Sequence, residues 1–276
     1  MLNAVDSIYR VESILGKGRG IIANRSIDRG TVILSEAPFI LQTLGLTQST
    51  IKDSLSRKSV EDQRRYLELK NCHRGTLPPL LGIFRTNALP CGSHDSFTGQ
   101  TADTAGIFLQ GSLFNSSCLP NVNNCWDPTN RVIVFRALRD IAEGEELSIC
   151  YKNLFDARDA RRSELRTNFR FDCQCAACSL SGEALQLSDQ RRMTLKGLYH
   201  EIPSYANQPS VGVTKVRKID SNFGAIMFTH AGCCRSNWRF NSCSRKAFSL
   251  TGTASRMTHI SFVSRFPTSV TRKRGL

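Results

Sequence analysis

The feature of this sequence that most constrains its fold is a group of three cysteines in the segment FDCQCAAC, residues 171–178. Cys173, Cys175 and Cys178 lie close together in sequence, and clustered cysteines at such spacing are typical of a metal site. Zinc binds four tetrahedral ligands, with sulfur at about 2.3 Å. Three thiolates therefore leave one ligand position to be filled from elsewhere in the chain.

The segment FNSSCLPN, residues 114–121, contains the best candidate for the fourth ligand. Cys118 has no second cysteine near it in sequence, its neighbours are small and polar, and Pro120 argues against a central strand. We therefore predict a structural zinc site in which Cys118 joins the three clustered cysteines and ties the segment FDCQCAAC back onto a central loop. The alternative is that the clustered cysteines are free thiols.

The N-terminal sequence and the cysteine usage indicate a soluble intracellular protein. Asp6 and Glu12 occupy the region where a signal peptide has its apolar stretch, and no apolar run approaches the roughly 18 residues of a membrane span. Because intracellular thiols are kept reduced, the 11 cysteines are not expected to form a disulfide framework. We expect residence in the nucleus or cytoplasm, with no secretion and no membrane partner. The basic end TRKRGL is compatible with the nucleus.

Positive charge is concentrated in the C-terminal region. Residues 181–276 contain 15 Lys and Arg against 4 Asp and Glu, and hence most of the net charge of +14. No helical or strand period is sustained there. Three interpretations stay open: a disordered basic arm, a weakly specified helical region, or sequence not shaped by selection for folding, which we favour. Nucleic acid is the partner that we rank last, because basic and aromatic residues do not interleave regularly.

Two segments of similar pattern indicate a fold of small sheets. NRSIDRGTVIL, residues 24–34, and LRDIAEGEELSI, residues 138–149, share a frame of Arg, Ile and Gly in which the glycine makes a turn between strand-like runs. This repeat favours an α+β, mostly β architecture over a parallel α/β sheet. The glycines of GKGRGI, residues 16–21, are not predicted to bind a dinucleotide, because no helix opens after them.

Two helices are predicted from charge and capping patterns. SVEDQRRYLELK opens with Ser59 and Asp62 in a capping-box pattern and predicts a helix near residues 60–70. DARDARRSELRT predicts a second helix near residues 157–167, with Asp156 as its N-terminal cap. The alternating charges of this helix favour a solvated face for its arginines.

Five motifs in order, GKGRGI, RTNAL, FNSSCLPN, GEELSICY and FRFDCQCAAC, resemble those of the SET-domain lysine methyltransferases, especially the fungal branch allied to the SET-and-MYND proteins. The resemblance spans about residues 10–180. It implies a SET-type fold of small sheets, with a pseudoknot that brings FNSSCLPN beside GEELSICY. It divides the chain into a SET domain (1–155, helical insert about 42–85), a post-SET zinc segment (156–180) and the basic region (181–276). The insert has no C-x2-C pairs, so no MYND zinc finger is expected.

The resemblance also implies S-adenosylmethionine as cofactor and a lysine-bearing protein, histone or non-histone, as substrate. By their positions in the motifs, the residues expected to bind the cofactor are Lys17, Gly18, Arg19, Gly20, Asn87, Asn115, Ser116 and Phe171. Phe169 and Tyr151 would line the lysine channel, while Cys118, Cys173, Cys175 and Cys178 match the post-SET zinc ligands. Ser116 replaces the family's histidine, so the alternative function is a non-catalytic binding module with an impaired cofactor site.

Tyr151 is the predicted catalytic residue. Methyl transfer from a sulfonium to an amine is a direct displacement, so most of the rate comes from alignment of the reacting atoms. A narrow, partly apolar channel favours the uncharged amine that this reaction needs. We expect the Tyr151 phenol, which ends the strand-like run LSICY, to orient that amine. The alternative for this residue alone is an ordinary strand-end tyrosine with its ring in the core.

Overall fold

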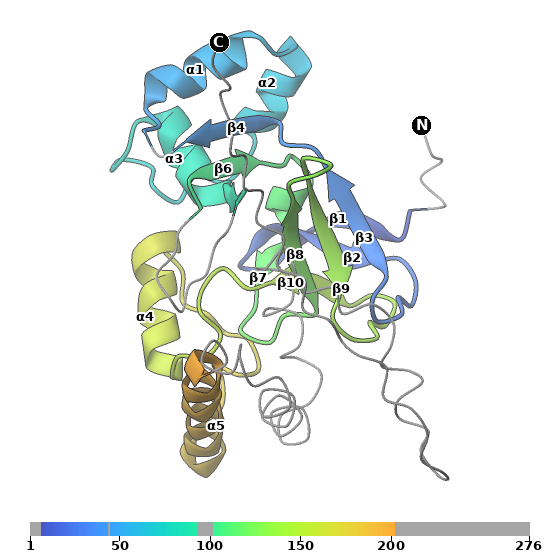
Figure 1. Cartoon of the computed structure of the whole chain (residues 1–276), viewed down its shortest axis with the longest axis vertical. Coiled ribbons are helices and arrows are strands. Elements are labelled where there is room, and N and C mark those ends of the chain that lie inside the picture. Colours follow the sequence, from blue (N-terminus) through green and yellow to red (C-terminus); the bar gives the residue numbers. More distant parts are fainter. Residues whose placement is uncertain (1–6, 44, 93–101, 202–276) are drawn as a thin grey trace, which may run out of the picture. The chain divides into compact units, whose positions relative to one another are not determined.

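The computed structural model describes residues 7–43, 45–92 and 102–201 of the chain, which fold into three small sheets and five α-helices (Figure 1). The first sheet contains, in spatial order, β1 (Tyr9–Ile14), β2 (Gly18–Ala23), β10 (Glu146–Ile149) and β7 (Asn115–Ser116). The second contains β3 (Val32–Glu36), β9 (Val132–Ala137) and β8 (Val122–Asp127). The third contains β4 (Ile40–Thr43), β6 (Thr104–Ile107) and β5 (Leu89–Pro90), and a short 3-10 helix spans Gly111–Leu113. The predicted α+β class with small sheets is confirmed.

The pairing of β7 with β10 joins two segments that are distant in sequence. These two strands are parallel, with Asn115 opposite Ser148 and Ser116 opposite Ile149. The backbone N–H of Ser117 then donates to the carbonyl of Ile149 at 2.9 Å. The expectation that FNSSCLPN lies beside GEELSICY is therefore confirmed, and the remaining pairs of this first sheet are antiparallel.

The repeated Arg, Ile and Gly frame has a structural counterpart. Ile27 and Ile141 pair with each other, and each backbone N–H donates to the other's carbonyl at 2.9 Å. Gly30 and Gly144 occupy equivalent turns with φ of 87° and 80°, a conformation that glycine adopts at little cost. Two similar strand entries are thus packed against one another, which explains why the sequence pattern occurs twice.

The main hydrophobic core takes residues from the first two sheets. Phe114 and Phe135 stack at its centre with ring centroids 4.4 Å apart, and both side chains are almost completely buried. Ile21, Ile133 and Leu147 are fully buried around them. Phe114 immediately precedes β7, so burial of its ring fixes the start of the FNSSC segment.

The helical insert between β4 and β5 has a core of its own. It contains α1 (Gln48–Ser56), α2 (Val60–Leu67) and α3 (Pro79–Asn87). The Ser59 side chain caps α2 by accepting from the N–H of Asp62, so the helix predicted near residues 60–70 is confirmed. Tyr66 is fully buried between the helices, and its hydroxyl donates to the carbonyl of Leu80 at 2.8 Å.

The two C-terminal helices correct two predictions. α4 (Arg158–Phe169) confirms the predicted helix, but Asp156 does not cap it. Instead Asp189, from α5 (Gly182–Glu201), accepts from the N–H of Arg158 at 2.9 Å, while Asp156 pairs with Lys196 at 2.7 Å. The expectation of a solvated arginine face is wrong for Arg161, whose side chain is 1% exposed.

The basic C-terminal region is described only in its first part. Residues 182–201 form α5, and residues 202–276 lie outside the described part of the chain. The three interpretations of residues 181–276 therefore stay untested for residues 202–276, while residues 182–201 are helical. Within the described residues, no helix combines the length and apolarity needed to span a membrane.

Candidate active site and metal centre

The structure brings Cys118 together with the three clustered cysteines. The four sulfur atoms all lie within 4.8 Å of one another, and those of Cys118 and Cys178 are 3.6 Å apart. Bonds of 2.3 Å to a tetrahedral ion would place sulfur atoms about 3.8 Å apart. Cys118, Cys173 and Cys178 are buried and Cys175 is half-buried. This four-cysteine cluster has the ligand number and spacing of a structural zinc site.

Proton sharing within the cluster favours thiolates at two positions. Hydrogen bonding from Cys118 is the main cause that lowers the pKa of Cys173, to about 7, and the pKa of Cys175. Hydrogen bonding to Cys173 and Cys175 correspondingly raises the pKa of Cys118. Because thiolates rather than thiols bind metals, a zinc ion would displace the shared protons.

The environment of Arg161 in α4 gives independent evidence on whether the cysteine cluster suits a metal ion. Its Nε and Nη2 atoms are buried and have no hydrogen-bond partner within the described residues. Burial lowers the pKa of Arg161, but the neighbouring Cys118 and Cys178 outweigh that effect and raise it overall. Nη1 of Arg161 donates to the carbonyl of Asp156, but buried N–H groups without an acceptor, such as those on Nε and Nη2, are costly. A zinc tetrathiolate carries net negative charge and accepts N–H groups. The residues around the cluster therefore fit a metal centre better than four neutral thiols.

Arg192 of α5 extends this arrangement. Its guanidinium donates to the carbonyl of Cys118 at 3.0 Å and to the carbonyl of Leu154. Its neighbour on the same helix, Asp189, lies 3.8 Å from Arg161. α5 is thus held against the loop that carries Cys118, a position that no pattern in residues 181–276 had indicated.

The glycine motif GKGRGI forms the tight turn between β1 and β2 and the start of β2. Gly16 and Gly18 have φ of 75° and 82°, which strains any residue with a side chain. Gly20 is required for a different reason, because a Cβ there would stand 2.6 Å from Nδ2 of Asn115. That amide donates to the carbonyl of Arg19 at 3.3 Å. The structure therefore brings the predicted cofactor residues of the turn and of β7 together.

Glu146 of β10 links the same two segments and was not predicted. Its carboxylate pairs with Lys17 at 2.5 Å and accepts from Nδ2 of Asn115 at 3.0 Å. Arg19 is also engaged, since its guanidinium donates to the carbonyl of Glu68 at 2.9 Å. Glu146 lies opposite Ile22 of β2, so its role follows from the pairing of β10 with β2, which no local motif in the sequence indicates.

Asn87 and Ser116, which were also predicted to bind the cofactor, do not contact the glycine turn through a side-chain hydrogen bond within the described residues. Asn87 is the last residue of α3, and its amide donates to the carbonyls of Lys70 at 2.6 Å and Ile83 at 2.7 Å. Its own carbonyl accepts from the Ser112 hydroxyl at 3.1 Å, which ties the insert to the segment leading into β7. Ser116 ends β7 and is half-buried beside Ile149.

Three aromatic residues pack around the cysteine cluster, namely Tyr151, Phe169 and Phe171. The rings of Tyr151 and Phe169 are 4.9 Å apart and tilted by 46°. The Tyr151 hydroxyl donates to the carbonyl of Phe114 at 2.7 Å. Burial, and then the charges of Glu146 and Cys72, raise the pKa of Tyr151, so the phenol is neutral at pH 7. Because its proton is committed to Phe114, its oxygen lone pairs remain to accept from another donor.

Comparison with known protein families defines the class of this chain. The SET domain family matches residues 18–152, which run from the start of β2 to the residue after Tyr151. The chain belongs to the SET-domain proteins, as its motifs and the parallel pairing of β7 with β10 had indicated.

Lysine methyltransferases and a SET and MYND domain-containing protein are among the relatives of this chain. Histone-lysine N-methyltransferase set5 of Schizosaccharomyces pombe is 36% identical over 189 residues, which cover 68% of this chain and 56% of that protein. Human histone-lysine N-methyltransferase SMYD3 is 34% identical over 104 residues, covering 37% of this chain and 24% of that protein. A SET and MYND domain-containing protein of Dictyostelium discoideum is 27% identical over 219 residues, covering 74% and 51% respectively. The chain thus spans 56% or less of the length of each of these relatives.

Proposed function

We propose that this chain transfers a methyl group from S-adenosylmethionine to the side-chain amine of a protein lysine. The observation that carries the proposal is the parallel pairing of β7 with β10, which places Asn115 and Ser116 beside the strand that ends one residue before Cys150 and leads to Tyr151. The glycine turn, the aromatic cluster and the cysteine cluster surround these residues. The SET family match and the names of two relatives support the same activity.

The proposed cofactor site uses the predicted residues in defined roles. The backbone of Lys17, Gly18, Arg19 and Gly20, with Asn115, would hold the methionine part of the cofactor, and Asn87 and Ser116 would complete that site. Phe171 would pack on the adenine. When bound, S-adenosylmethionine supplies an electron-poor methyl group on a sulfonium. Glu146 would position Asn115 and Lys17, with which it already interacts.

The proposed lysine channel is formed by Tyr151 and Phe169. Their rings, 4.9 Å apart, provide a partly apolar wall that disfavours the ammonium form of an entering lysine. The Tyr151 oxygen would accept an N–H of the uncharged amine and so align the nitrogen with the methyl group. Since the pKa of Tyr151 is raised, the residue would orient the amine and would not act as a tyrosinate base.

This role predicts a specific pH profile. Turnover should rise between pH 7 and 9.5, because the fraction of uncharged lysine grows as pH approaches its ordinary pKa of about 10.4. Ionisation of Tyr151 should cause no decline below pH 10, because its pKa lies above the usual value of 10.0. Initial rates measured with saturating cofactor across this range test the expectation. A falling limb below pH 9 that disappears in Tyr151→Phe would contradict it.

We further propose that a structural zinc ion occupies the four-cysteine cluster, with Cys118, Cys173, Cys175 and Cys178 as ligands. The SET domain would then extend over residues 1–155 and the zinc segment over 156–180. A lysine-bearing protein, with histones as the first candidates, is the proposed substrate, because two of the relatives are named histone-lysine N-methyltransferases. Those names likewise support residence in the nucleus. Nucleic-acid binding through the basic region is a lower-ranked proposal.

Ser116 is expected to limit cofactor affinity. Replacing it with histidine would add an imidazole that can hydrogen-bond beside Asn115, and one such bond contributes about 1 kcal/mol. We expect Ser116→His to tighten S-adenosylmethionine binding about fivefold. Titration calorimetry measures the change, with Thr129→His, on the exposed turn between β8 and β9, as the control. Equal affinities of Ser116→His and the unaltered protein would exclude Ser116 as the limiting residue.

Methyl transfer itself is tested with labelled cofactor. The zinc-loaded full chain is incubated with methyl-labelled S-adenosylmethionine and core histones, and the products are digested and mapped by mass spectrometry. The proposal predicts methyl-lysine on a substrate protein and an initial rate of labelling about 10²-fold lower with Tyr151→Phe. The alternative, a non-catalytic SET-like module, is favoured by the loss of histidine at position 116. It predicts no label on histones or on a lysine peptide library, whether or not the cofactor binds.

A further inference from the structure

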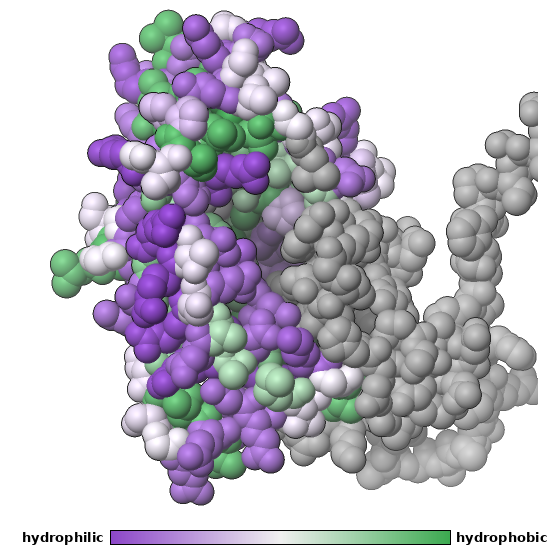
Figure 2. Space-filling view, turned by 90° about the vertical axis from the view of Figure 1, so that its left-hand side faces the viewer, coloured by the Kyte–Doolittle hydropathy of each residue, from purple (hydrophilic) through white to green (hydrophobic). Residues whose placement is uncertain are grey.

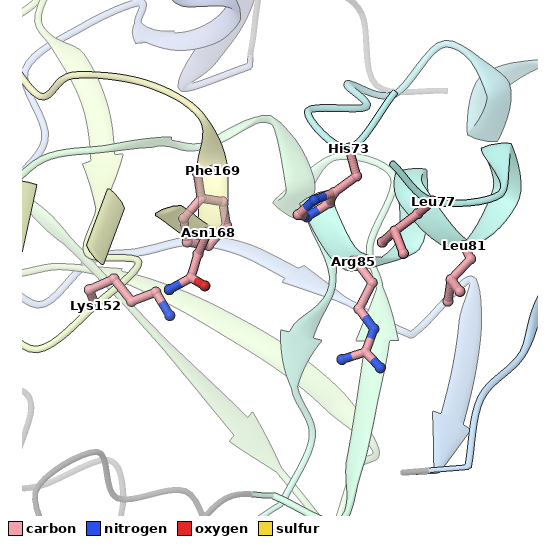
Figure 3. Close-up of a pocket in the computed structure, with 7 residues that line it drawn as sticks. All are labelled: His73, Leu77, Leu81, Arg85, Lys152, Asn168 and Phe169. Atoms are coloured by element: carbon pink, nitrogen blue, oxygen red, sulfur yellow. The ribbon is translucent and has the colours of Figure 1, made fainter. Parts of the chain in front are cut away.

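A pocket of about 440 Å³ lies beside the proposed lysine channel and has no role in the function proposed above (Figure 3). Seven residues line it: His73, Leu77, Leu81, Arg85, Lys152, Asn168 and Phe169. They come from the loop before α3, from α3 itself, from the residue after Tyr151 and from the end of α4. The pocket is therefore formed jointly by the insert and the post-SET segment.

Its position relative to the channel follows from two residues. Phe169 lines the pocket and also contacts the Tyr151 ring at 4.9 Å. Lys152 lines the pocket and is covalently adjacent to Tyr151. A peptide whose lysine enters beside Tyr151 would therefore pass the pocket with a neighbouring residue, since an extended chain advances about 3.3–3.6 Å per residue.

The pocket is positively charged. Arg85 projects into it from α3, and the Lys152 ammonium faces the same open space from the other side (Figure 3). Arg85 has no ion pair or side-chain hydrogen bond in the described part of the chain. Lys152 is already paired with Glu164 at 3.2 Å. Arg85 is thus the cation available to a ligand.

The remaining side chains that line the pocket further limit the kind of group that it can bind. Burial, and then the charges of Arg170 and Arg85, lower the pKa of His73, so its imidazole is neutral at pH 7 and able to hydrogen-bond. Leu77 and Leu81 supply an apolar wall suited to the methylene groups of a side chain. The surrounding face of the molecule, with the insert above and α4 and α5 below, is predominantly hydrophilic (Figure 2). A short aliphatic stem that ends in a carboxylate matches these features.

We infer that this pocket receives an acidic side chain of the substrate, glutamate in preference to aspartate, within about three residues of the target lysine. The inference rests on the proposed function, because it assumes that the lysine enters beside Tyr151. The guanidinium of Arg85 binds the carboxylate in a charge-assisted pair, and Leu77 and Leu81 contact its methylene groups. A lysine or arginine at the same substrate position is repelled. The pocket therefore selects among lysines by the charge of one neighbour.

The test separates binding from turnover. A peptide library with norleucine at the centre, as an uncharged analogue of lysine, is captured by the tagged, zinc-loaded full chain with S-adenosylhomocysteine, and bound peptides are sequenced by mass spectrometry. The unaltered protein should enrich glutamate over lysine at least fivefold at one position near the centre. Arg85→Lys should keep this preference and Arg85→Glu should invert it. Arg74→Glu, an exposed arginine of the same segment that does not line the pocket, is the matched control.

A parallel library with central lysine and labelled cofactor reports turnover. Acidic enrichment that Arg85→Glu inverts supports the inference. Equal enrichment by the unaltered protein and by Arg85→Glu, or no peptide retained by the unaltered protein, overturns it. Acidic enrichment without any methylated lysine would refute the proposed function and leave the assignment of the pocket in place.

Discussion

Replacing Cys118 with serine should abolish stable zinc binding and unfold the segment that carries Cys173, Cys175 and Cys178. These residues, with Leu165 and Ala177, form a small buried cluster that has little apolar surface without the metal. Structural zinc contributes about 10–16 kcal/mol in small zinc domains, which is comparable with the roughly 5–15 kcal/mol stability of a whole domain. We expect the metal content to fall from about one zinc per chain to near zero, and the melting temperature to fall sharply.

The matched control for this prediction is Cys91→Ser. Cys91 is as buried as Cys118, but it belongs to the main core, and burial raises the pKa of its thiol to about 12. The Cys91→Ser substitution should therefore lower the free energy of unfolding by about 1–3 kcal/mol and leave the zinc content unchanged. Metal analysis of both purified variants, with protease digestion of the segment after α4, makes the comparison. Full zinc occupancy in Cys118→Ser would contradict the assignment of Cys118 as a ligand.

Replacing Tyr151 with phenylalanine should reduce kcat about 10²-fold, which is typical for removal of one hydrogen-bonding group that acts on the reacting atoms. The variant should also lose stability, because the carbonyl of Phe114 loses the hydroxyl that donates to it at 2.7 Å. A lost partner of this kind costs about 1–3 kcal/mol. A protein that loses this much stability remains folded, so the loss of stability alone should not lower kcat about 10²-fold.

Tyr66→Phe provides the control, because Tyr66 is also buried and its hydroxyl also donates to a backbone carbonyl, that of Leu80, at 2.8 Å. The two variants should lose similar stability in thermal denaturation, and only Tyr151→Phe should lose kcat. Steady-state kinetics make the test, with a lysine-bearing peptide or protein that the unaltered enzyme methylates as substrate. Equal kcat values for the two variants would remove Tyr151 from the catalytic role.

Residue spacing was sufficient to predict which four cysteines lie together. Cys173, Cys175 and Cys178 needed a fourth ligand, and Cys118 stood in a polar loop where a buried apolar role was implausible. The structure brings all four sulfur atoms together. The expectation of small sheets followed similarly from the repeated frame, and Ile27 and Ile141 of that frame pair directly in the structure. Both predictions rest on residue types that have few structural roles, namely clustered cysteines and glycines at turns between strands.

The charged residues near the sites could not be placed in this way. Arg161 lies in a run of alternating charges that is typical of a solvated helix, and only its tertiary position beside Cys118 and Cys178 explains its burial. Asp189 caps α4 across a distance in sequence that no local pattern reveals. Glu146 likewise acquires its role from the pairing of β10 with two other strands. Contacts of this kind depend on the fold and not on a local motif.

The helix α5 was missed for a different reason. Its sequence lacks a clear apolar face, and among the side chains described along it only Ser188 and Leu195 are buried. Leu195 packs with Leu154 and Phe155, and Arg192 fixes the helix to the loop of Cys118. Asp189 and Lys196 add polar contacts to α4 and to Asp156 just before it. Anchoring by scattered polar contacts and few apolar ones leaves little periodic signal in the sequence.

Calorimetric titration of S-adenosylmethionine into the zinc-loaded full chain measures whether the chain binds the cofactor that methyl transfer requires. A cofactor site built from the glycine turn, Asn115 and Phe171 should give saturable one-to-one binding with a dissociation constant in the micromolar range. A folded chain with about one zinc per molecule that shows no binding up to millimolar cofactor would contradict the claim that this SET domain is a methyltransferase.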